Sequence, residues 1–556
     1  MSASLEADVV IIGSGVAGSL IAWRLAEAKL KVLILEAGPR IDRVEAFKSY
    51  LAARDKHASA PYPPAPYAPA PQYNSWNDYY INTGPDLFRG LYTRGLGGST
   101  WHWAGSVLRY RQSDFRMKSR FGVGVDWPIS YEELAPFYDE AEQVLGVAGS
   151  NTESWGAPRT SDYPMPAIPP SYLDTVVADV LGPLGMSLAV FPQARNSMFY
   201  DERPQCCGNA SCVPLCPIGA KYDASVHATK AENAGARLET DAVVHRLETG
   251  ADRLVSTVHF RRPDGSAGTC AGRIVVIAAH AIETPKLLLM SRNERTPNGV
   301  ANSSDTVGRY LMSHIDQGTR GLTKTPIYPY RGPVITSAIP EFRDGPFRGN
   351  HSAIGTSISN EGWRHVGPQE TAITLINQGF SGKRLKERIA WRTERELTLG
   401  STAETLPDPN NRIVPDETKM DAIGIPRPRI HYRIDEYAKA GLGLTIQRHE
   451  AIFAALQSIQ VETLPMVTSS GTIVGTTRMG NDPRESAVGR DLRAHDHANL
   501  FIVGGMVFPT AGMHPPTLSI AAPGAKGNAR NQAELCGVAV RFWARSRDCG
   551  VRDRDH

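Results

Sequence analysis

Four cysteines lie within eleven residues of this 556-residue chain, at Cys206, Cys207, Cys212 and Cys216. Thiolates so close in sequence can converge on one centre, and the glycines and prolines around them keep the loop open, so that backbone N–H groups can face sulfur. The pair Cys216-Pro217 also resembles the end of bacterial ferredoxin motifs. These residues alone leave two possibilities, an iron–sulfur cluster or a structural zinc ion.

A second pattern with chemical meaning is a glycine-rich turn made by Gly13, Gly15 and Gly18. It follows an apolar strand and opens a predicted helix, so backbone N–H groups can approach a pyrophosphate at the helix N-terminus. Glu36 ends the next predicted strand, 23 residues after Gly13, where a carboxylate accepts hydrogen bonds from ribose hydroxyls. We therefore predict a dinucleotide site, and the acidic Glu36 argues against NADP.

The elements that position these residues indicate an α/β fold. Residues 8–37 read as strand, turn, helix and strand, whereas 240–290 alternate strand signals before a further helix. Residues 130–146 form a predicted helix, capped by Ser130 at its start and Gly146 at its end. We expect a discontinuous nucleotide domain (1–130, 220–320 and 468–535), a substrate domain (131–200 and 321–467), a cysteine loop (201–219) and an atypical tail (536–556).

The overall composition and charge argue against several classes of function. The formal net charge is +3 and no Lys/Arg-rich block is present, so a nucleic-acid partner is not expected. No segment has the roughly 18 uninterrupted apolar residues of a membrane span. The N-terminus enters the first strand almost directly, so we expect no signal peptide.

The motifs resemble the glucose–methanol–choline oxidoreductase family along nearly the whole chain. The resemblance lies in the opening unit 8–39, the glycine loop 95–100, and the segments 278–289, 475–480 and 499–504. It implies FAD as the cofactor, bound by a Rossmann-like domain beside a substrate domain with an antiparallel sheet. It also implies that the flavin site contains Gly97, Gly98, Ser99 and Gly505, with His102 in contact with the flavin, where relatives such as choline oxidase carry a covalent link.

The cysteine segment resembles the large subunits of membrane-associated FAD-dependent fructose, glucose, sorbitol and gluconate dehydrogenases. The resemblance implies an iron–sulfur cluster, expected to be 3Fe-4S. Adjacent Cys206 and Cys207 point apart, so we expect Cys206, Cys212 and Cys216 as ligands and Cys207 as a spare. It further implies a small subunit carrying the export signal, a haem c cytochrome subunit, and a place at the periplasmic face of the inner membrane. Without such partners the chain would stay cytoplasmic.

The catalytic positions depart from the family pattern. The family's base histidine corresponds to Thr472, and a threonine cannot act as a base at neutral pH. The second family position, an asparagine or histidine, corresponds to Pro515. His514, one place earlier, is our first candidate for the base; His102, His314 or His351 are alternatives, and an impaired enzyme is a third possibility.

We therefore expect an FAD-dependent dehydrogenase that oxidises an alcohol of a sugar, polyol or sugar acid, and passes electrons through the cluster to a cytochrome. The alternatives are an oxygen-using oxidase and a flavin and iron–sulfur subunit that only relays electrons. Near the C-terminus, Pro523 and Gly524 should break the helix that the family continues there.

Overall fold

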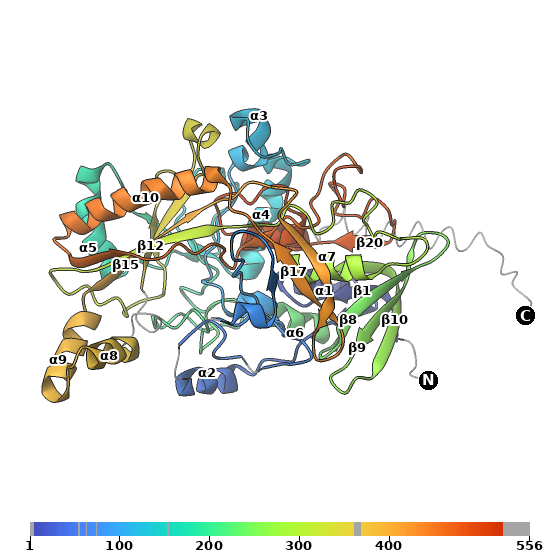
Figure 1. Cartoon of the computed structure of the whole chain (residues 1–556), viewed down its shortest axis with the longest axis horizontal. Helices are drawn as coiled ribbons and strands as arrows, with labels where there is room; N and C mark the ends of the chain where they lie inside the picture. Colours follow the sequence, from blue (N-terminus) through green and yellow to red (C-terminus); the bar gives the residue numbers. More distant parts are fainter. Residues whose placement is uncertain are drawn as a thin grey trace, which may run out of the picture.

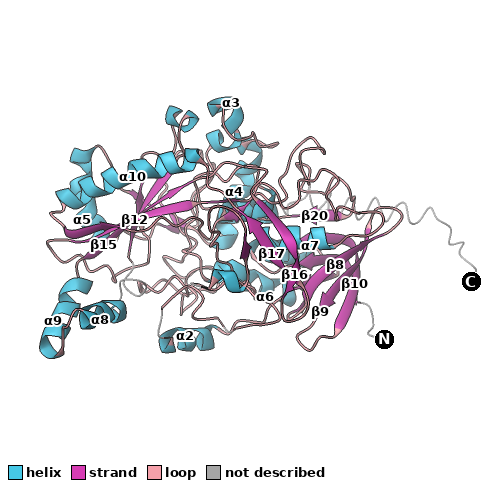
Figure 2. Ribbon diagram, viewed as in Figure 1, coloured by secondary structure: helices cyan, strands magenta, loops and turns pink. Residues whose placement is uncertain are grey.

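Two sheets at opposite ends of the molecule organise the chain (Figure 1). The computed structural model describes residues 5–53, 56–62, 64–73, 75–152, 155–360 and 368–525. Helices and strands occur in both halves (Figure 2), so the α/β class expected from the sequence is confirmed. Within the described ranges, no helix is both long and apolar enough to cross a membrane.

The first sheet has seven strands in the order β7-β2-β1-β10-β9-β8, with β20 paired to β10. Its strands are β1 (Leu5–Ile12), β2 (Val32–Leu35), β7 (Arg237–Glu239), β8 (Val243–Thr249), β9 (Val255–Arg261), β10 (Ala267–Ile277) and β20 (Leu500–Ile502). Strands from three separated segments thus form one sheet. β7, β2, β1, β10 and β20 pair in parallel, and β8 and β9 extend the sheet as an antiparallel meander.

The parallel part of this sheet is covered on both faces, which explains the continuous apolar run of β1. All four residues from Val9 to Ile12 are buried, as a doubly covered strand requires. Helix α1 (Val16–Glu27) returns the chain and packs against α6 (Ser225–Asn233) and α11 (Thr517–Ala525). The turn between β1 and α1 lies at the carboxyl edge of the sheet, where ligands bind in such folds.

The second sheet is antiparallel, with the order β18-β12-β15-β14-β13-β6. Its strands are β6 (Ala189–Val190), β12 (Ile315–Leu322), β13 (Ser337–Ile339), β14 (Ile354–Ser359), β15 (Glu396–Ala403) and β18 (Ile459–Thr463). Helix α10 (Glu436–Ala455) lies across it (Figure 1), and its Ile452 and Phe453 share a core with α5 (Tyr172–Leu181) and β15. The antiparallel second sheet of the expected fold is therefore present.

Three small sheets and further helices connect these halves. The strands are β3 (Ile81–Asn82) with β16 (Arg412–Met420) and β17 (Pro426–His431), β4 (Ala148–Gly149) with β5 (Met165–Pro166), and β11 (Met312–Ser313) with β19 (Ile473–Val474). The helices are α2 (Arg43–Ala52), α3 (Met117–Phe121), α4 (Tyr131–Leu145), α7 (His280–Met290), α8 (Pro368–Asn377) and α9 (Gly382–Thr393). The β11–β19 pair brings segments 160 residues apart to the junction of the two sheets.

Two sequence expectations for helices have different outcomes. Helix α4 has the predicted capping box between Ser130 and Glu133 and ends at Gly146 in the left-handed conformation. The expected break at Pro523 and Gly524 is wrong, because α11 runs through both residues to Ala525. The packing of α11 against α1 and α4 accounts for the helix despite these residues. The atypical tail (536–556) lies outside the described residues.

Candidate active site and cysteine loop

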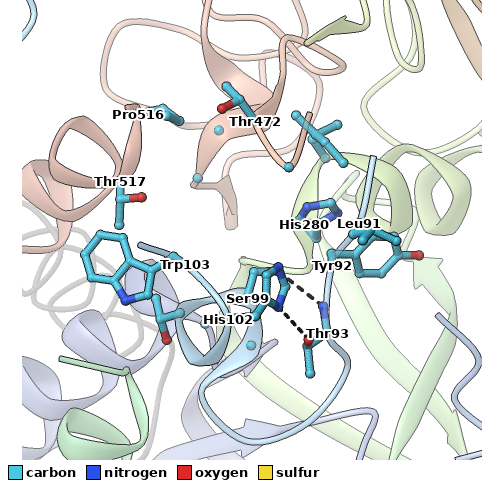
Figure 3. Close-up of a pocket in the computed structure, with 18 of the residues that line it drawn as sticks. Leu91, Tyr92, Thr93, Ser99, His102, Trp103, His280, Thr472, Pro516 and Thr517 are labelled. Atoms are coloured by element: carbon cyan, nitrogen blue, oxygen red, sulfur yellow. Dashed lines mark hydrogen bonds between the residues drawn. The ribbon is translucent and has the colours of Figure 1, made fainter. Parts of the chain in front are cut away.

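A cavity of about 800 Å³ joins the two sheets. Its walls include Gly13 and Glu36 from the first sheet, and His314 and Asp316 from the junction and the second sheet. Figure 3 shows its middle part, where the Ser99–Trp103 segment faces Thr472 and Pro516 across open space. A cavity of this size and two-ended construction can hold an elongated cofactor together with a small substrate.

The three predicted glycines of the first turn have different roles. At Gly13, φ is +98° and an added Cβ would lie 2.6 Å from the carbonyl oxygen of Ala278; at Gly18 it would lie 2.1 Å from the carbonyl oxygen of Gly13. Both positions therefore require glycine for packing of the protein itself. At Gly15 an added Cβ would meet no described residue within 4 Å other than its chain neighbours, so the space beside it is left for a ligand.

The start of α1 is suited to an anionic ligand. Gly15 is its N-cap residue and offers no side-chain acceptor, so the first N–H groups of the helix remain available to phosphate oxygens. Glu36 is 5% exposed, and its carboxylate accepts hydrogen bonds from Ser14 N (3.0 Å), Ser14 Oγ (2.6 Å) and Gly38 N (3.0 Å). These bonds hold Glu36 in the cavity wall. The pyrophosphate and ribose of a dinucleotide fit this arrangement.

The second glycine loop adjoins the first. Gly97 N–H donates a hydrogen bond to Ser14 Oγ (3.3 Å), and an added Cβ at Gly98 would lie 3.3 Å from the Cα of Gly15. Ser99 Oγ accepts a hydrogen bond from Thr93 N (3.3 Å). Gly98 and Ser99 lie in the cavity wall, so the structure brings the two predicted cofactor loops together.

His102 follows this loop and faces the cavity (Figure 3). Its Nδ1 bonds to Thr93 Oγ1 (2.8 Å), which leaves Nε2 as the second ring nitrogen. Burial, with a smaller contribution from the nearby Lys221 ammonium, lowers the pKa of His102 to about 3. The imidazole is therefore neutral at physiological pH, fixed by Thr93, and adjacent to the space beside Ser99.

Three of the predicted site residues, Thr472, Pro515 and Gly505, lie in the cavity wall. Thr472 N–H donates to Ser470 Oγ (3.1 Å), and the carbonyl oxygen of Gly505 accepts from Gly475 N (3.0 Å). Thr472 lies across the cavity from His102 (Figure 3). The threonine hydroxyl has no basicity at neutral pH, so this wall needs a base from another residue.

His514 is not among the residues that line the cavity, although Met513 and Pro515 on either side of it are. It is fully buried, with its ring edge-on to Tyr110 at a centroid distance of 6.2 Å. Neither ring nitrogen has a hydrogen-bond partner among the described residues. Burial, followed by the positive charge of Arg343, lowers the pKa of His514 well below its usual range. His514, our first candidate for the base, is therefore buried next to the cavity lining but does not face the cavity.

His314 is the histidine that the β11–β19 pair brings to this wall. Its Nε2 lies 2.7 Å from the carbonyl oxygen of Gly512, and a carbonyl only accepts, so Nε2 carries the proton and Nδ1 keeps its lone pair. Burial lowers the pKa of His314 to about 4, although the Gly512 bond opposes this. The third alternative, His351, stacks on Phe347 and bonds to Ser352 O, and it does not line the cavity.

Two charged residues at the same end were missed by the sequence reasoning. Asp316 accepts a hydrogen bond from Thr402 Oγ1 (2.7 Å), and burial raises its pKa to about 6. Arg343 also lines the cavity. The alternation of β12 could have indicated that Asp316 faces one side of a sheet, whereas Arg343 follows β13 in a segment without a motif.

The cysteine loop presents its thiols unequally. Cys212 and Cys216 are buried, Cys206 is half-buried and Cys207 is exposed, and none of the four forms a disulfide. Cys206 Sγ accepts a hydrogen bond from Gly208 N (3.4 Å), and Cys216 Sγ accepts one from Lys221 N (3.5 Å). Across the described ranges, no group of three or more His, Cys, Asp or Glu side chains is arranged to hold a metal ion.

Lys221 connects this loop to the flavin-side loop. Its buried ammonium donates to the carbonyl oxygens of Cys212 (2.9 Å), Trp101 (2.8 Å) and Trp103 (2.6 Å). Trp101 and Trp103 flank His102, and Val213 of the cysteine loop reaches the cavity wall. The cysteine loop and the predicted flavin site are therefore neighbours.

Comparisons with known proteins match this architecture. Sequence profiles described as GMC oxidoreductase match residues 184–316 and 407–524, and one described as FAD dependent oxidoreductase matches residues 8–48. The chain is 41% identical over 528 residues to the fructose dehydrogenase large subunit of Gluconobacter japonicus, covering 93% of this chain and 96% of that protein. The chain belongs to the GMC oxidoreductase family. It is an FAD-dependent oxidoreductase, as the sequence motifs predicted.

Proteins with lower sequence identity extend the comparison. The 2-methyl-1,2-propanediol dehydrogenase of Mycolicibacterium austroafricanum is 29% identical, with 93% of each chain covered. The gluconate 2-dehydrogenase flavoprotein of Pantoea cypripedii is 24% identical, with 93% of this chain and 92% of that protein covered. A solved structure titled as pyridoxine 4-oxidase from Mesorbium loti superposes with a TM-score of 0.65 at 17% identity, covering 95% of this chain and 99% of that one; this similarity shows the fold alone.

Proposed function

We propose that this protein oxidises an alcohol group of a sugar, polyol or sugar acid, and passes the electrons outward through an iron–sulfur cluster. The observation that carries this proposal is the single cavity with a dinucleotide cradle at one end and polar and charged side chains at the other. His314, Asp316 and Arg343 at the second end can bind or act on a hydroxylated substrate. The 41% identical fructose dehydrogenase large subunit supports a sugar-like substrate.

We assign the role of general base to His314. A base for alcohol oxidation must be unprotonated and must reach the hydroxyl proton. His314 satisfies the first condition because its pKa is about 4 and its Nε2 proton is held by Gly512, which leaves Nδ1 as the acceptor. It satisfies the second because it lines the cavity, whereas His514 does not.

FAD, when bound, supplies the hydride acceptor for this oxidation. The chain's own residues then do the remaining work. Gly15 and the start of α1 hold the pyrophosphate, Glu36 holds the ribose, and His314 takes the hydroxyl proton. His102, fixed by Thr93, lines the same cavity as a neutral side chain.

The cysteine loop fits an iron–sulfur cluster better than a zinc ion. A zinc site would require four ligands around one point, whereas the loop has three buried or half-buried thiols and one exposed thiol, at Cys207. A three-iron cluster needs three thiolates, one for each iron. Cys206, Cys212 and Cys216 supply them, and the N–H···S bonds to Cys206 and Cys216 are the kind that tune such clusters. Exposed Cys207 is the spare.

The surface beside this loop suits a protein partner. Met198 and Phe199 are 50% and 70% exposed, and Cys206 N bonds back to Asn196 O, just before them. Large exposed apolar side chains commonly mark protein interfaces. We propose that a small subunit with an export signal and a haem c cytochrome subunit bind here, which would hold the complex at the periplasmic face of the inner membrane.

The test is anaerobic reduction of the bound flavin by fructose, glucose, sorbitol and gluconate, with the chain purified together with its small subunit. We expect one or more of these compounds to bleach the visible flavin band, and cytochrome c to be reduced once it is added. A preparation with full flavin and iron that none of them bleaches would overturn the proposed oxidation and leave an electron-relay subunit. Bleaching followed by rapid peroxide formation in air, with no cytochrome reduction, would indicate an oxidase.

A further inference from the structure

Arg343 is a buried cation at the substrate end of the cavity that forms no hydrogen bond or ion pair with any described residue. The residue is 4% exposed, and its Nε and Nη1 atoms are buried without hydrogen bonds to any described residue. It also forms no ion pair within the described ranges. Arg348, five residues later, shows the usual arrangement, because its guanidinium pairs with Asp114 (2.8 Å) and Glu404 (2.9 Å). Burial of an unpaired charge is unfavourable, so Arg343 needs a reason other than stability.

The surroundings of Arg343 hold its guanidinium in place but do not neutralise it. The guanidinium lies over the rings of Trp155 (5.0 Å) and Phe191 (5.6 Å). Gly355 leaves it room, since an added Cβ there would lie 2.9 Å from Arg343 Nη2. Burial lowers the pKa of Arg343 to about 9, the positive charge of Arg111 adds to this shift, and the negative charge of Asp114, which is paired with Arg348, opposes it. The side chain is therefore charged at neutral pH and kept rigid with its N–H groups unused.

Arg343 lies close to the reacting end of the site. It is one of the charges that lower the pKa of His314, and it shares the cavity wall with His314 and Ser357. A planar guanidinium with unused donors is the group that proteins use to bind carboxylates in a bidentate manner. The nearby Asp114 carboxylate is already paired with Arg348, so a substrate anion would supply the direct ion pair that Arg343 forms with no described residue.

We propose that Arg343 binds an anionic group of the substrate, and that the preferred substrate is a sugar acid rather than a neutral sugar or polyol. A carboxylate fits better than a phosphate, because one unpaired guanidinium balances one negative charge. This inference rests on the proposed alcohol oxidation, of which it names the substrate class.

The experiment compares sorbitol, gluconate and sorbitol 6-phosphate as reductants of the flavin in the anaerobic holoprotein. These three compounds share a six-carbon polyol chain and differ in the anionic group. We expect KM for gluconate to be at least tenfold lower than for sorbitol. Arg343→Met should raise KM for gluconate at least 100-fold while changing sorbitol less than threefold, and Arg343→Lys should restore part of the difference. Preference for sorbitol 6-phosphate over gluconate would overturn the carboxylate assignment.

Two controls separate a binding role from a structural one. Arg331→Met removes the same charge from an exposed residue outside the cavity, and it should leave all three KM values unchanged. The unfolding temperature of Arg343→Met without substrate should stay equal to or exceed that of the wild type, since no described partner loses a bond. A fall of several degrees, together with equal loss towards sorbitol and gluconate, would show that Arg343 is structural.

Glutarate, which has no hydroxyl group, distinguishes failure of this inference from failure of the proposed function. Its binding is measured by perturbation of the flavin spectrum. Glutarate that perturbs the wild type but not Arg343→Met would support the anion site even if no polyol bleached the flavin. Bleaching by sorbitol with no glutarate binding would overturn the anion site and leave the proposed oxidation standing.

Discussion

The two ends of the cavity are formed by different kinds of groups, mainly backbone at one end and side chains at the other. The cofactor end uses backbone: a turn with Gly15, a helix N-terminus and a carboxylate, Glu36, whose oxygens are already hydrogen-bonded. The substrate end uses side chains. Two of them, His314 and Arg343, each have at least one ring or guanidinium nitrogen that forms no hydrogen bond with a described residue. The difference indicates that the first end is set for one ligand common to a family, and the second for a particular substrate.

The largest expected effect comes from substitutions in the glycine turn that precedes α1. Gly18→Val places side-chain atoms against the Gly13 carbonyl, so we expect a destabilised protein with no bound flavin. Gly15→Ala is the matched control, because its added methyl group meets no described residue within 4 Å other than its chain neighbours. It should leave the unfolding temperature of the apoprotein unchanged and weaken FAD binding at least tenfold. Flavin content and apoprotein thermal unfolding measure both; equal behaviour of the two variants would contradict the division of roles.

The substrate end is tested by its two histidines. His314→Gln should slow anaerobic flavin reduction by about 10²- to 10⁴-fold, as loss of a general base does. His514→Gln removes a buried ring that is absent from the cavity wall, so it should lower stability but slow flavin reduction less than tenfold. Stopped-flow flavin reduction at saturating substrate gives both values. The reverse order of effects would restore His514 as the base.

Substitutions in the cysteine loop should impair electron transfer to the cytochrome without impairing substrate oxidation. Cys212→Ser should remove iron and cut cytochrome reduction by roughly 10- to 100-fold, because loss of one ligand breaks the cluster, while flavin bleaching by substrate persists. Cys207→Ser, at the exposed cysteine, should retain iron and both activities. Iron content and electron paramagnetic resonance check this, and loss of iron in Cys207→Ser would instead assign the exposed thiol to the cluster.

The smallest effect concerns the charge state of Asp316. Burial raises its folded pKa to about 6, above the ordinary value of 3.8. Its stabilising contribution is therefore complete below pH 3.8 and is lost as the pH rises through 6. Asp316→Asn should remove this dependence and stabilise the protein by about 1–3 kcal/mol at pH 7. Thermal unfolding from pH 4 to pH 8 measures the difference, and parallel curves for the two proteins would refute it.

The same contrast explains what the sequence could predict. The glycine turn, Glu36 and the capped helix at 130–146 depend on residues close in the chain, so their spacing indicates their structure. The proposed base, His314, does not depend on local residues. It comes close to Thr472 only through the β11–β19 pair, which no local pattern indicates. The position of His514 beside Pro515 predicts a base there, but the direction of a side chain in an irregular segment is a property of the packed fold.

The first sheet also governs when the protein can mature. Its central strand β10 pairs on one edge with β1, from the start of the chain, and on the other with β20, where Val275 lies opposite Leu500. The sheet is therefore completed only after some 500 residues have been synthesised, which takes on the order of a minute at about 5–20 residues per second. Val503 and Gly504, just after β20, line the cavity, so flavin bound there would report a nearly finished chain. A complex that assembles only with the flavin-loaded subunit would therefore exclude truncated chains without a separate quality-control step.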